Sequence, residues 1–383
     1  MTRARPDFAV VGQGLIGLST AVALARRGKS VIALDALGSG HPLTSSTGAS
    51  RSIRAAYAEP LYVRLALEAL AAWRALEVET GRSILHLTGQ VDLAPAAMLD
   101  QIETGMAAEG VAARRLAADG LAAVFPELRL RPGEQALYHD SGGTVLAAEG
   151  MAVLADVASD LGAELAAPEQ VSRIELADDG VHLRTDARTV EAESVVVAAG
   201  PWAGALLSPL GIDLPLSPGV AQVTYVDVPH LVGRPGIADW AIEESGRGVY
   251  GHPVPGMGYK IAFDAAGVEP WSGTASEWPP DLAEQEQLLG WAADRFAGTA
   301  MPVIESQRHP WTMTPDTDFV IDADGRLVVA CGCSGHAFKF GPALGELVAD
   351  IALGIDREER AMFSMRRPAM SLAAVDASTP IDR

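Results

Sequence analysis

Three glycines near the amino terminus have the spacing at which a chain can bind the phosphates of a dinucleotide. Gly12, Gly14 and Gly17 follow an apolar run at 8–11 and precede a helical pattern of small and apolar residues at 18–27. Gly12 permits a tight turn, Gly14 lets the backbone approach a pyrophosphate, and Gly17 allows a helix to pack closely on a strand. A short, uninterrupted apolar run before such a turn is typical of a buried strand.

The residues around this turn complete a dinucleotide-binding unit. The backbone N–H groups of Leu15 and Ile16 lie at the expected helix N-terminus, where the helix dipole favours an anion. A second strand at 30–34 ends on Asp35, where a carboxylate would accept hydrogen bonds from a ribose hydroxyl. Ala36 offers no positive charge for a 2′-phosphate, so the pattern does not favour NADP.

Two later segments favour FAD over NAD. A buried strand at 194–197 runs into Ala199 and Gly200, and a glycine-rich turn follows the strand expected at 327–330. Both look like further approaches of backbone to the same cofactor. A large cofactor that crosses several sequence-distant loops suits FAD better than NAD.

Composition excludes several classes of function. The 383-residue chain has a formal net charge of −20 and no dense run of Lys or Arg, so we expect no nucleic-acid partner and no anionic membrane partner. No apolar run is long enough to span a bilayer, and no metal-ligand pattern stands out. The two cysteines, Cys331 and Cys333, are too close for a disulfide and are expected to be packing thiols. A cytoplasmic monomer is the expectation.

The specific resemblance lies in the last third of the chain. The segments 311–316 (WTMTPD), 319–322 (FVID) and 333–340 (CSGHAFKF) resemble the signature of the monomeric sarcosine oxidase and N-methyltryptophan oxidase family, which is D-amino-acid oxidase-like. The segment 48–54 (GASRSIR) and the pair Pro201 and Trp202 resemble the same family. The similarity covers nearly the whole chain and is weakest at 86–146.

This resemblance implies an α/β fold with a Rossmann-like FAD-binding domain of the GR2 type and a mixed, β-rich substrate domain. We expect a discontinuous FAD-binding domain at 1–85, 145–215 and 312–370, a substrate domain at 86–144 and 216–311, and a C-terminal tail at 371–383. Helices are expected at 61–78, 148–161, 281–296 and 341–352 from their periodicity. A polar, Gly- and Ser-rich stretch at 38–54 is too long for an idle connector.

The resemblance also implies an activity. Members of the family oxidise the C–N bond of small N-alkyl amino acids to imines, and O₂ accepts the electrons and becomes H₂O₂. We expect a small amino acid or amine and O₂ as the reactants of this chain. A dehydrogenase of the same fold with another electron acceptor, and an oxidase of a cyclic or specialised biosynthetic imino acid, are the alternatives.

Site roles follow from the resemblance residue by residue. Arg54 and Lys339 match the pair that binds the substrate carboxylate, and Arg51 and Lys260 match basic residues beside the flavin. Tyr250 matches an active-site tyrosine that contacts substrate. His336 matches the loop next to the flavin ring. Trp311 replaces a smaller ring of the family, and we expect it either to form a wall of the substrate pocket or to stack on the substrate. The expected cofactor contacts are Gly12, Gly14, Leu15, Ile16, Gly17, Asp35, Ser45, Ser46, Thr47, Ser50, Arg51, Val171, Ala199, Gly200, Trp202, His309, Gly335, His336, Ala337 and Lys339.

These residue types suit the chemistry, although each also has an ordinary structural interpretation. An Arg and a Lys together can fix a carboxylate and aim the neighbouring C–H bond at a hydride acceptor. A buried ammonium would stabilise the negative charge that forms when O₂ takes up an electron. Without the resemblance, these cations would be read as solvated surface charges and Tyr250 as a half-buried strand aromatic.

Three positions depart from the family pattern. His309 lies where the family has the cysteine that links the flavin covalently, so a thioether is impossible. A histidyl link is chemically conceivable, and non-covalent FAD is the expectation. Thr47 and Asp264 lie where the family often has histidines. Asp264 could hold a substrate amine, although a strand-end acid outside the site is the favoured interpretation. The changed pocket makes sarcosine itself an uncertain substrate.

Overall fold

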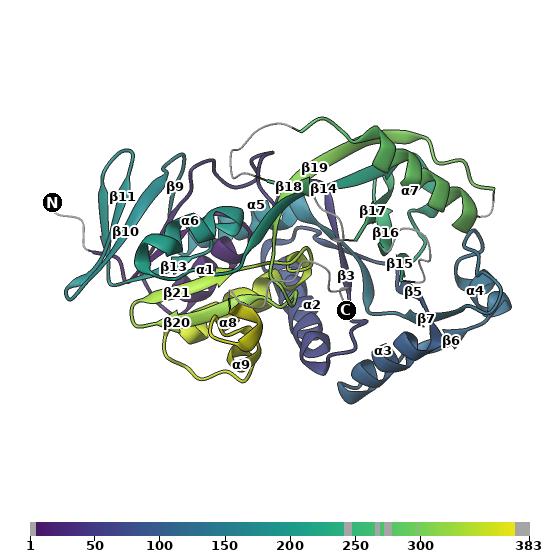
Figure 1. Cartoon of the computed structure of the whole chain (residues 1–383), viewed down its shortest axis with the longest axis horizontal. Coiled ribbons are helices and arrows are strands. Elements are labelled where there is room, and N and C mark those ends of the chain that lie inside the picture. Colours follow the sequence, from purple (N-terminus) through teal and green to yellow (C-terminus); the bar gives the residue numbers. More distant parts are fainter. Residues whose placement is uncertain (1–4, 241–246, 265–268, 272–277, 297, 372–383) are drawn as a thin grey trace.

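A computed structural model describes residues 5–240, 247–264, 269–271, 278–296 and 298–371 (Figure 1). Its strands form a six-stranded sheet, a nine-stranded sheet and two three-stranded sheets. In Figure 1 the six-stranded sheet lies towards the amino-terminal side of the view, and the nine-stranded sheet lies at the opposite end.

The six-stranded sheet is parallel apart from one edge strand, and its order is β20-β21-β13-β1-β2-β9. Its strands are β1 (Phe8–Val11), β2 (Val31–Leu34), β9 (Glu164–Ala166), β13 (Ser194–Val197), β20 (Val320–Asp324) and β21 (Leu327–Cys331). The runs of Val, Ile and Leu in the central strands suit a sheet that is covered on both faces.

Helices cover one face of this sheet and a small sheet covers the other. Phe8 and Val10 pack with the helices, whereas Ala9 and Val11 pack towards β10–β12. The helices are α1 (Leu15–Arg26), α2 (Pro60–Thr80), α5 (Ala147–Asp160) and α8 (Gly341–Ala352). The small sheet contains β10 (Val171–Ala177), β11 (Gly180–Thr185) and β12 (Thr189–Ala192). A Cβ at Gly345 would lie 2.4 Å from the backbone of Ser19, so α1 and α8 cross at a distance that only glycine allows.

The nine-stranded sheet has the order β18-β14-β17-β16-β15-β5-β7-β6, and β19 pairs with the other side of β14. Its strands are β5 (Gln90–Ala94), β6 (Arg114–Leu116), β7 (Gln135–His139), β14 (Ser217–Val226), β15 (Gly236–Asp239), β16 (Val249–Val254), β17 (Gly258–Phe263), β18 (Glu269–Pro270) and β19 (Val303–Met313). The helices beside it are α3 (Ala96–Ala108), α4 (Ala118–Val124) and α7 (Leu282–Arg295).

The two faces of this sheet differ in chemistry because side chains alternate along a strand. The outer face carries Val91, Ile237 and Ile261, which pack with Leu288 of α7 in an apolar core. On the other face Lys260 pairs with Tyr225 on one side and with His252 on the other. A row of polar residues therefore faces the remaining three-stranded sheet, formed by β3 (Ser50–Arg54), β8 (Gly142–Leu146) and β4 (Leu85–Leu87).

The helices expected at 61–78, 148–161, 281–296 and 341–352 are confirmed as α2, α5, α7 and α8. Asp281 is the N-cap of α7 and accepts hydrogen bonds from the N–H groups of Ala283 and Glu284. The expected division into two domains stays a prediction; its boundaries at 85/86, 144/145 and 311/312 fall inside β4, β8 and β19. Short helices α6 (Ala203–Leu207) and α9 (Glu359–Phe363) complete the described chain.

None of the helices in the described residues is long and apolar enough to cross a lipid bilayer.

Candidate active site

A cavity of about 640 Å³ lies between the six-stranded sheet and the polar face of the nine-stranded sheet. Its walls come from the glycine turn after β1, the end of β2, the turn after β13, strands β14, β17 and β19, and the loop after β21. Cofactor sites in open α/β sheets lie at these carboxyl ends of strands, and the volume falls in the usual range of roughly 300–1,000 Å³.

The glycine turn is held in a form that only glycine can adopt at its first position. Gly12 has φ of 110°, and a Cβ there would lie 2.4 Å from the carbonyl oxygen of Ala198. A Cβ at Gly17 would lie 1.9 Å from the Gly12 carbonyl oxygen. A Cβ added at Gly14 would have the Ser46 hydroxyl oxygen as its nearest neighbour, at 3.3 Å, so the backbone at this position stays open to the cavity. The tight turn at Gly12 and the close packing at Gly17 have the expected geometry. The pyrophosphate contact expected at Gly14 stays a prediction.

Asp35 fastens the end of β2 to this turn. One carboxylate oxygen accepts from the N–H of Gln13 at 2.7 Å, and the other accepts from the N–H groups of Leu37 and Gly38 at 2.8 and 2.7 Å. A carboxylate offers about four acceptor sites, so Asp35 has capacity for a ribose hydroxyl as well. Asp35 also lines the cavity.

Buried polar atoms without partners mark the opposite walls. The Ser45 hydroxyl, both ring nitrogens of His309 and the indole nitrogen of Trp311 make no hydrogen bond with the described part of the chain, and all three residues line the cavity. Buried polar groups are nearly always paired, so these atoms point to a bound polar group. With the glycine turn at one end, they suit an extended dinucleotide with a polar ring system.

Arg51 lines the cavity directly after the 45–50 segment. Its guanidinium donates to the carbonyl oxygens of Ser45, Thr47 and Ser50 at 2.9, 2.6 and 2.8 Å. The guanidinium carbon lies 5.4 Å from the ring centre of Phe338, which is another cavity residue. Burial lowers the pKa of Arg51, but an arginine stays charged, so the wall carries a fixed positive charge.

Lys260 is fully buried at the centre of the polar face. Its Nζ donates to the Ser50 carbonyl oxygen at 3.1 Å, and the Ser50 hydroxyl lies 3.0 Å from Nε2 of His252. Burial first, and then the charge of Arg51, lower the pKa of Lys260 well below its usual range. The same causes, together with Lys260 itself, lower the pKa of His252. A negative charge forming in the cavity would reverse this effect and draw a proton onto Lys260.

A second pair of cations meets at Tyr57. The guanidinium carbon of Arg54 lies 4.5 Å from the Tyr57 ring centre and 5.3 Å from that of Trp240. Nζ of Lys339 donates to the Tyr57 hydroxyl at 2.9 Å and to the His336 carbonyl oxygen at 2.7 Å. Arg54 and Lys339 are only 8% and 6% exposed. Two buried cations around one aromatic ring attract negative charge, so this arrangement is suited to a carboxylate.

The structure brings most of the predicted residues to the cavity wall. These are Gly12, Gly14, Leu15, Ile16, Asp35, Ser45, Ser46, Arg51, Val171, Ala199, Gly200, Trp202, Tyr250, Lys260, His309, Trp311, Gly335 and Ala337. Outside the lining lie Gly17, Thr47, Ser50, Arg54, His336 and Lys339. Gly17 serves helix packing, Thr47 and Ser50 hold Arg51, and the other three surround Tyr57. Asp264 directly follows β17 and also lies outside the lining.

Sequence reasoning missed Tyr57 and His252. Tyr57 follows Arg54 by three residues in a stretch without regular structure, and no local pattern marks it. His252 was detectable, because it lies two residues after Tyr250 on β16 and therefore on the same face of the strand.

The burial of two lysines argues against reading Lys260 and Lys339 as solvated surface charges. The chain has three lysines, Lys29, Lys260 and Lys339. Two of them are buried, although lysine is almost never fully buried without a specific reason. Tyr250 is half-buried, as an ordinary strand aromatic would be, but it lines the cavity.

The cysteines are free, and Cys331 is fully buried. Burial raises the pKa of the Cys333 thiol to about 11, so the thiol is uncharged at neutral pH. Within the described residues no cluster of three or more His, Cys, Asp or Glu side chains forms a metal site.

Known proteins resemble the chain over nearly its whole length. Residues 7–351 match the family described as FAD dependent oxidoreductase. Monomeric sarcosine oxidase of Streptomyces avermitilis is 33% identical over 385 residues, with 96% of this chain and 99% of that protein covered. Peroxisomal sarcosine oxidase of Mus musculus is 29% identical over 375 residues, with 94% and 96% covered.

Solved structures of amino acid oxidases are also similar to this chain over nearly its whole length. NikD, described as an unusual amino acid oxidase essential for nikkomycin biosynthesis, has a TM-score of 0.81 and 25% identity, and 94% of this chain and 98% of that chain are covered. Glycine oxidase from Geobacillus kaustophilus has a TM-score of 0.79 and 25% identity, with 95% and 99% covered. The glycine turn, the cavity with its unpaired polar atoms and these similarities agree. The chain belongs to the FAD-dependent oxidoreductase family that includes the monomeric sarcosine oxidases.

Proposed function

We propose that this chain is an amine oxidase that converts the C–N bond of a small N-alkyl or cyclic amino acid to an imine and passes the electrons to O₂, giving H₂O₂. The observation that carries this proposal is the pair of buried cations, Arg54 and Lys339, at Tyr57. The sarcosine oxidase names of the relatives support the same class of substrate.

Arg54 and Lys339 would bind the substrate carboxylate. Both are held before any substrate arrives: Arg54 between two aromatic rings, and Lys339 by Tyr57 and the His336 carbonyl. Side chains that are already ordered lose little entropy on binding. A carboxylate fixed here would leave the amine and its α-carbon directed towards the cavity, where Tyr250 and Trp311 form part of the wall.

FAD, held by the glycine turn, Asp35 and the 45–51 segment, would supply the hydride-accepting ring. Lys260 would supply a proton and a positive charge at Nζ when O₂ is reduced. Its lowered pKa supports this role, because an ammonium with a lowered pKa gives up its proton more readily than an ordinary lysine. Burial in a polar, water-poor wall strengthens the effect of its charge.

We further propose that FAD is bound without a covalent link and that the enzyme is a monomer. His309 provides no sulfur, and burial, followed by Arg51 and Lys260, lowers the pKa of its ring to about 3, so the imidazole is neutral. Acid precipitation tests the first point: flavin should stay in the supernatant, whereas yellow precipitated protein would indicate a bond. Sedimentation equilibrium tests the second.

An anaerobic titration tests the activity. Purified holoprotein is mixed with N-methylglycine, N-methyl-L-tryptophan, glycine and L-proline in turn, and the flavin absorption is followed before and after air is admitted. Bleaching by one compound with rapid recovery in air is the expected result. Slow recovery would indicate a dehydrogenase, and a protein that no amine bleaches would contradict the proposal.

Lysine variants separate the two steps. Lys260→Met should leave anaerobic bleaching largely intact but slow recovery in air by on the order of 10²-fold. Lys339→Met should weaken substrate binding and leave recovery in air unchanged. Lys29→Met is the matched control. It removes the same charge from a position just after α1 that does not line the cavity, and it should change neither step.

A further inference from the structure

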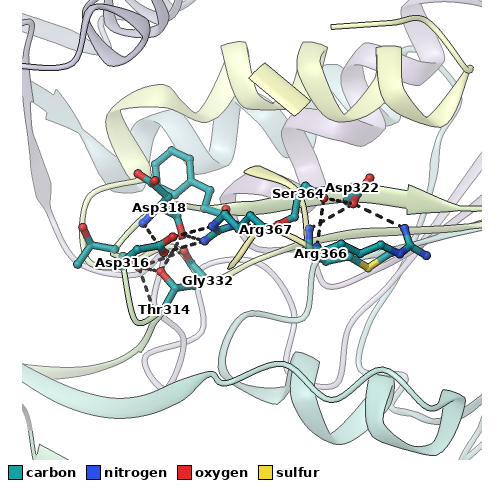
Figure 2. A network of polar contacts seen from close by, with 12 residues as sticks. Thr314, Asp316, Asp318, Asp322, Gly332, Ser364, Arg366 and Arg367 are labelled. Carbon is teal, nitrogen blue, oxygen red and sulfur yellow. Dashed lines mark hydrogen bonds and ion pairs between the residues drawn. The ribbon is translucent and has the colours of Figure 1, made fainter. Parts of the chain in front are cut away.

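Arg367 ties the C-terminal segment to the loop before β20 (Figure 2). Its guanidinium makes two parallel hydrogen bonds to the Asp316 carboxylate, at 2.7 and 2.8 Å. It also donates to the carbonyl oxygens of Asp318, Phe319 and Ser364, at 3.0, 2.8 and 3.1 Å. Burial alone would raise the pKa of Asp316, but the hydrogen bonds from Arg367 outweigh it and lower the pKa. The guanidinium therefore has all its donors engaged by a single loop and its own chain segment.

The loop that Arg367 holds has an unfavourable backbone conformation. Thr317 has φ of 65°, which is a left-handed conformation that a β-branched residue rarely adopts. Such a conformation costs of order 1–3 kcal/mol and persists only where the surroundings enforce it. Arg367 engages the residues on both sides of Thr317, so it supplies much of that enforcement.

Two routes of contact lead from this loop to Lys339. In the first, the Thr317 carbonyl oxygen lies 3.2 Å from Nε2 of His336, whose own carbonyl accepts from Nζ of Lys339. The carbonyl that makes this contact belongs to the residue with the left-handed conformation.

In the second route, Asp318 accepts from the Tyr62 hydroxyl at 2.8 Å. The Tyr62 ring stacks on Tyr57 with centres 5.3 Å apart, and the Tyr57 hydroxyl accepts from Lys339. Both routes therefore start in the loop that Arg367 holds, at the Thr317 carbonyl and the Asp318 carboxylate, and end at the same ammonium.

We propose that Arg367 is a positioning residue for substrate carboxylate binding, acting through the 314–318 loop on Lys339 and Tyr57. This inference rests on the proposed function, in which Lys339 binds the carboxylate. Arg367 does not line the cavity, and its own charge is paired with Asp316, so its effect would be geometric rather than electrostatic.

The test measures binding without turnover. Acetate and its uncharged analogue acetamide are titrated into oxidised holoprotein, and the change in the flavin spectrum gives each dissociation constant. Arg367→Met should weaken acetate binding about tenfold and leave acetamide nearly unchanged. Tyr62→Phe, which breaks only the second route, should weaken acetate by about threefold. Arg367→Lys should recover part of the loss.

Arg366→Met is the matched control, because Arg366 carries the same charge one residue away but pairs with Asp324 and Asp322 rather than with the 314–318 loop. It should bind acetate like the wild type. If Arg367→Met and Tyr62→Phe both retain full acetate affinity, the positioning role is wrong. If Arg367→Met fails to hold FAD, Tyr62→Phe decides alone. If the wild type itself does not prefer acetate to acetamide, the carboxylate role of Lys339 fails instead, and with it the proposed function.

Discussion

Asp92 is a buried carboxylate whose ionisation should cost the fold stability. It lies on the polar face of β5 with no exposed surface, and neither oxygen has a partner with good hydrogen-bond geometry in the described chain. Burial raises its pKa from 3.8 to about 6; the nearby Arg54 guanidinium and the side chains of Trp240 and Gln90 offset only part of that effect. We expect Asp92→Asn to make the protein more stable at neutral pH.

The magnitude follows from linkage. A pKa raised by about two units corresponds to about 3 kcal/mol, since one unit is about 1.4 kcal/mol. Because the folded-state pKa lies above the unfolded value, the carboxyl costs nothing below 3.8, and the cost grows as the pH rises through about 6. The gain from Asp92→Asn should therefore be near zero at about pH 4 and approach 3 kcal/mol above about pH 7.

The assay is urea unfolding of both proteins, loaded with FAD, from about pH 4 to about pH 8. Asp178→Asn, on the exposed turn between β10 and β11, is the control and should show no such dependence on pH. A difference that is constant with pH, or a variant that is less stable at neutral pH, would refute the reasoning, because it would mean that Arg54 fully compensates the buried charge. The variant should also bind substrate carboxylates more tightly, since Arg54 loses a competing anion.

Three further experiments test the glycine turn, the ion pairs of Arg295 and the burial of the lysines. Gly12→Ala should abolish FAD uptake because its Cβ would meet the Ala198 carbonyl, whereas Gly28→Ala, with open space around it, should retain FAD, as the flavin absorbance of the purified proteins will show. Arg295→Met should destabilise by about 3–5 kcal/mol in urea unfolding, because the fully buried Asp239 carboxylate and the partly buried Glu134 carboxylate lose the guanidinium that bonds both. Amine acetylation of the native protein should modify Lys29 but neither Lys260 nor Lys339, as read by peptide mass spectrometry; modification of a buried lysine would contradict the packing.

The parts of the fold that the sequence predicts are those whose cause is local. The glycine turn, Asp35 and the helices such as α2 and α8 each follow from spacing within a few turns of chain. The strand Ser50–Arg54 was not expected from its polar pattern, because it pairs with β8 across about ninety residues and its side chains serve the site rather than a core.

The site itself was predictable only in its residue types. Arg54 and Lys339 were expected to act together, but the feature that joins them, Tyr57, depends on tertiary contacts. The bonding of the 314–318 loop by Arg367 was not predicted either. It begins in a C-terminal segment with no periodic pattern, and its effect depends on a backbone conformation at Thr317 that no propensity favours.

The strand order of the six-stranded sheet also constrains how the chain acquires its shape during synthesis. β1 pairs with β13, and β13 in turn pairs with β21, so the centre of this sheet joins the first and the last third of the chain. The nine-stranded sheet needs nothing beyond Met313, whereas the cofactor sheet needs residues up to Cys331. Because distant pairings form slowly and translation supplies them last, the six-stranded sheet should stay incomplete until β21 has been synthesised. FAD can therefore stabilise the whole sheet only after β21 has joined it, and its binding would then favour the native state by mass action.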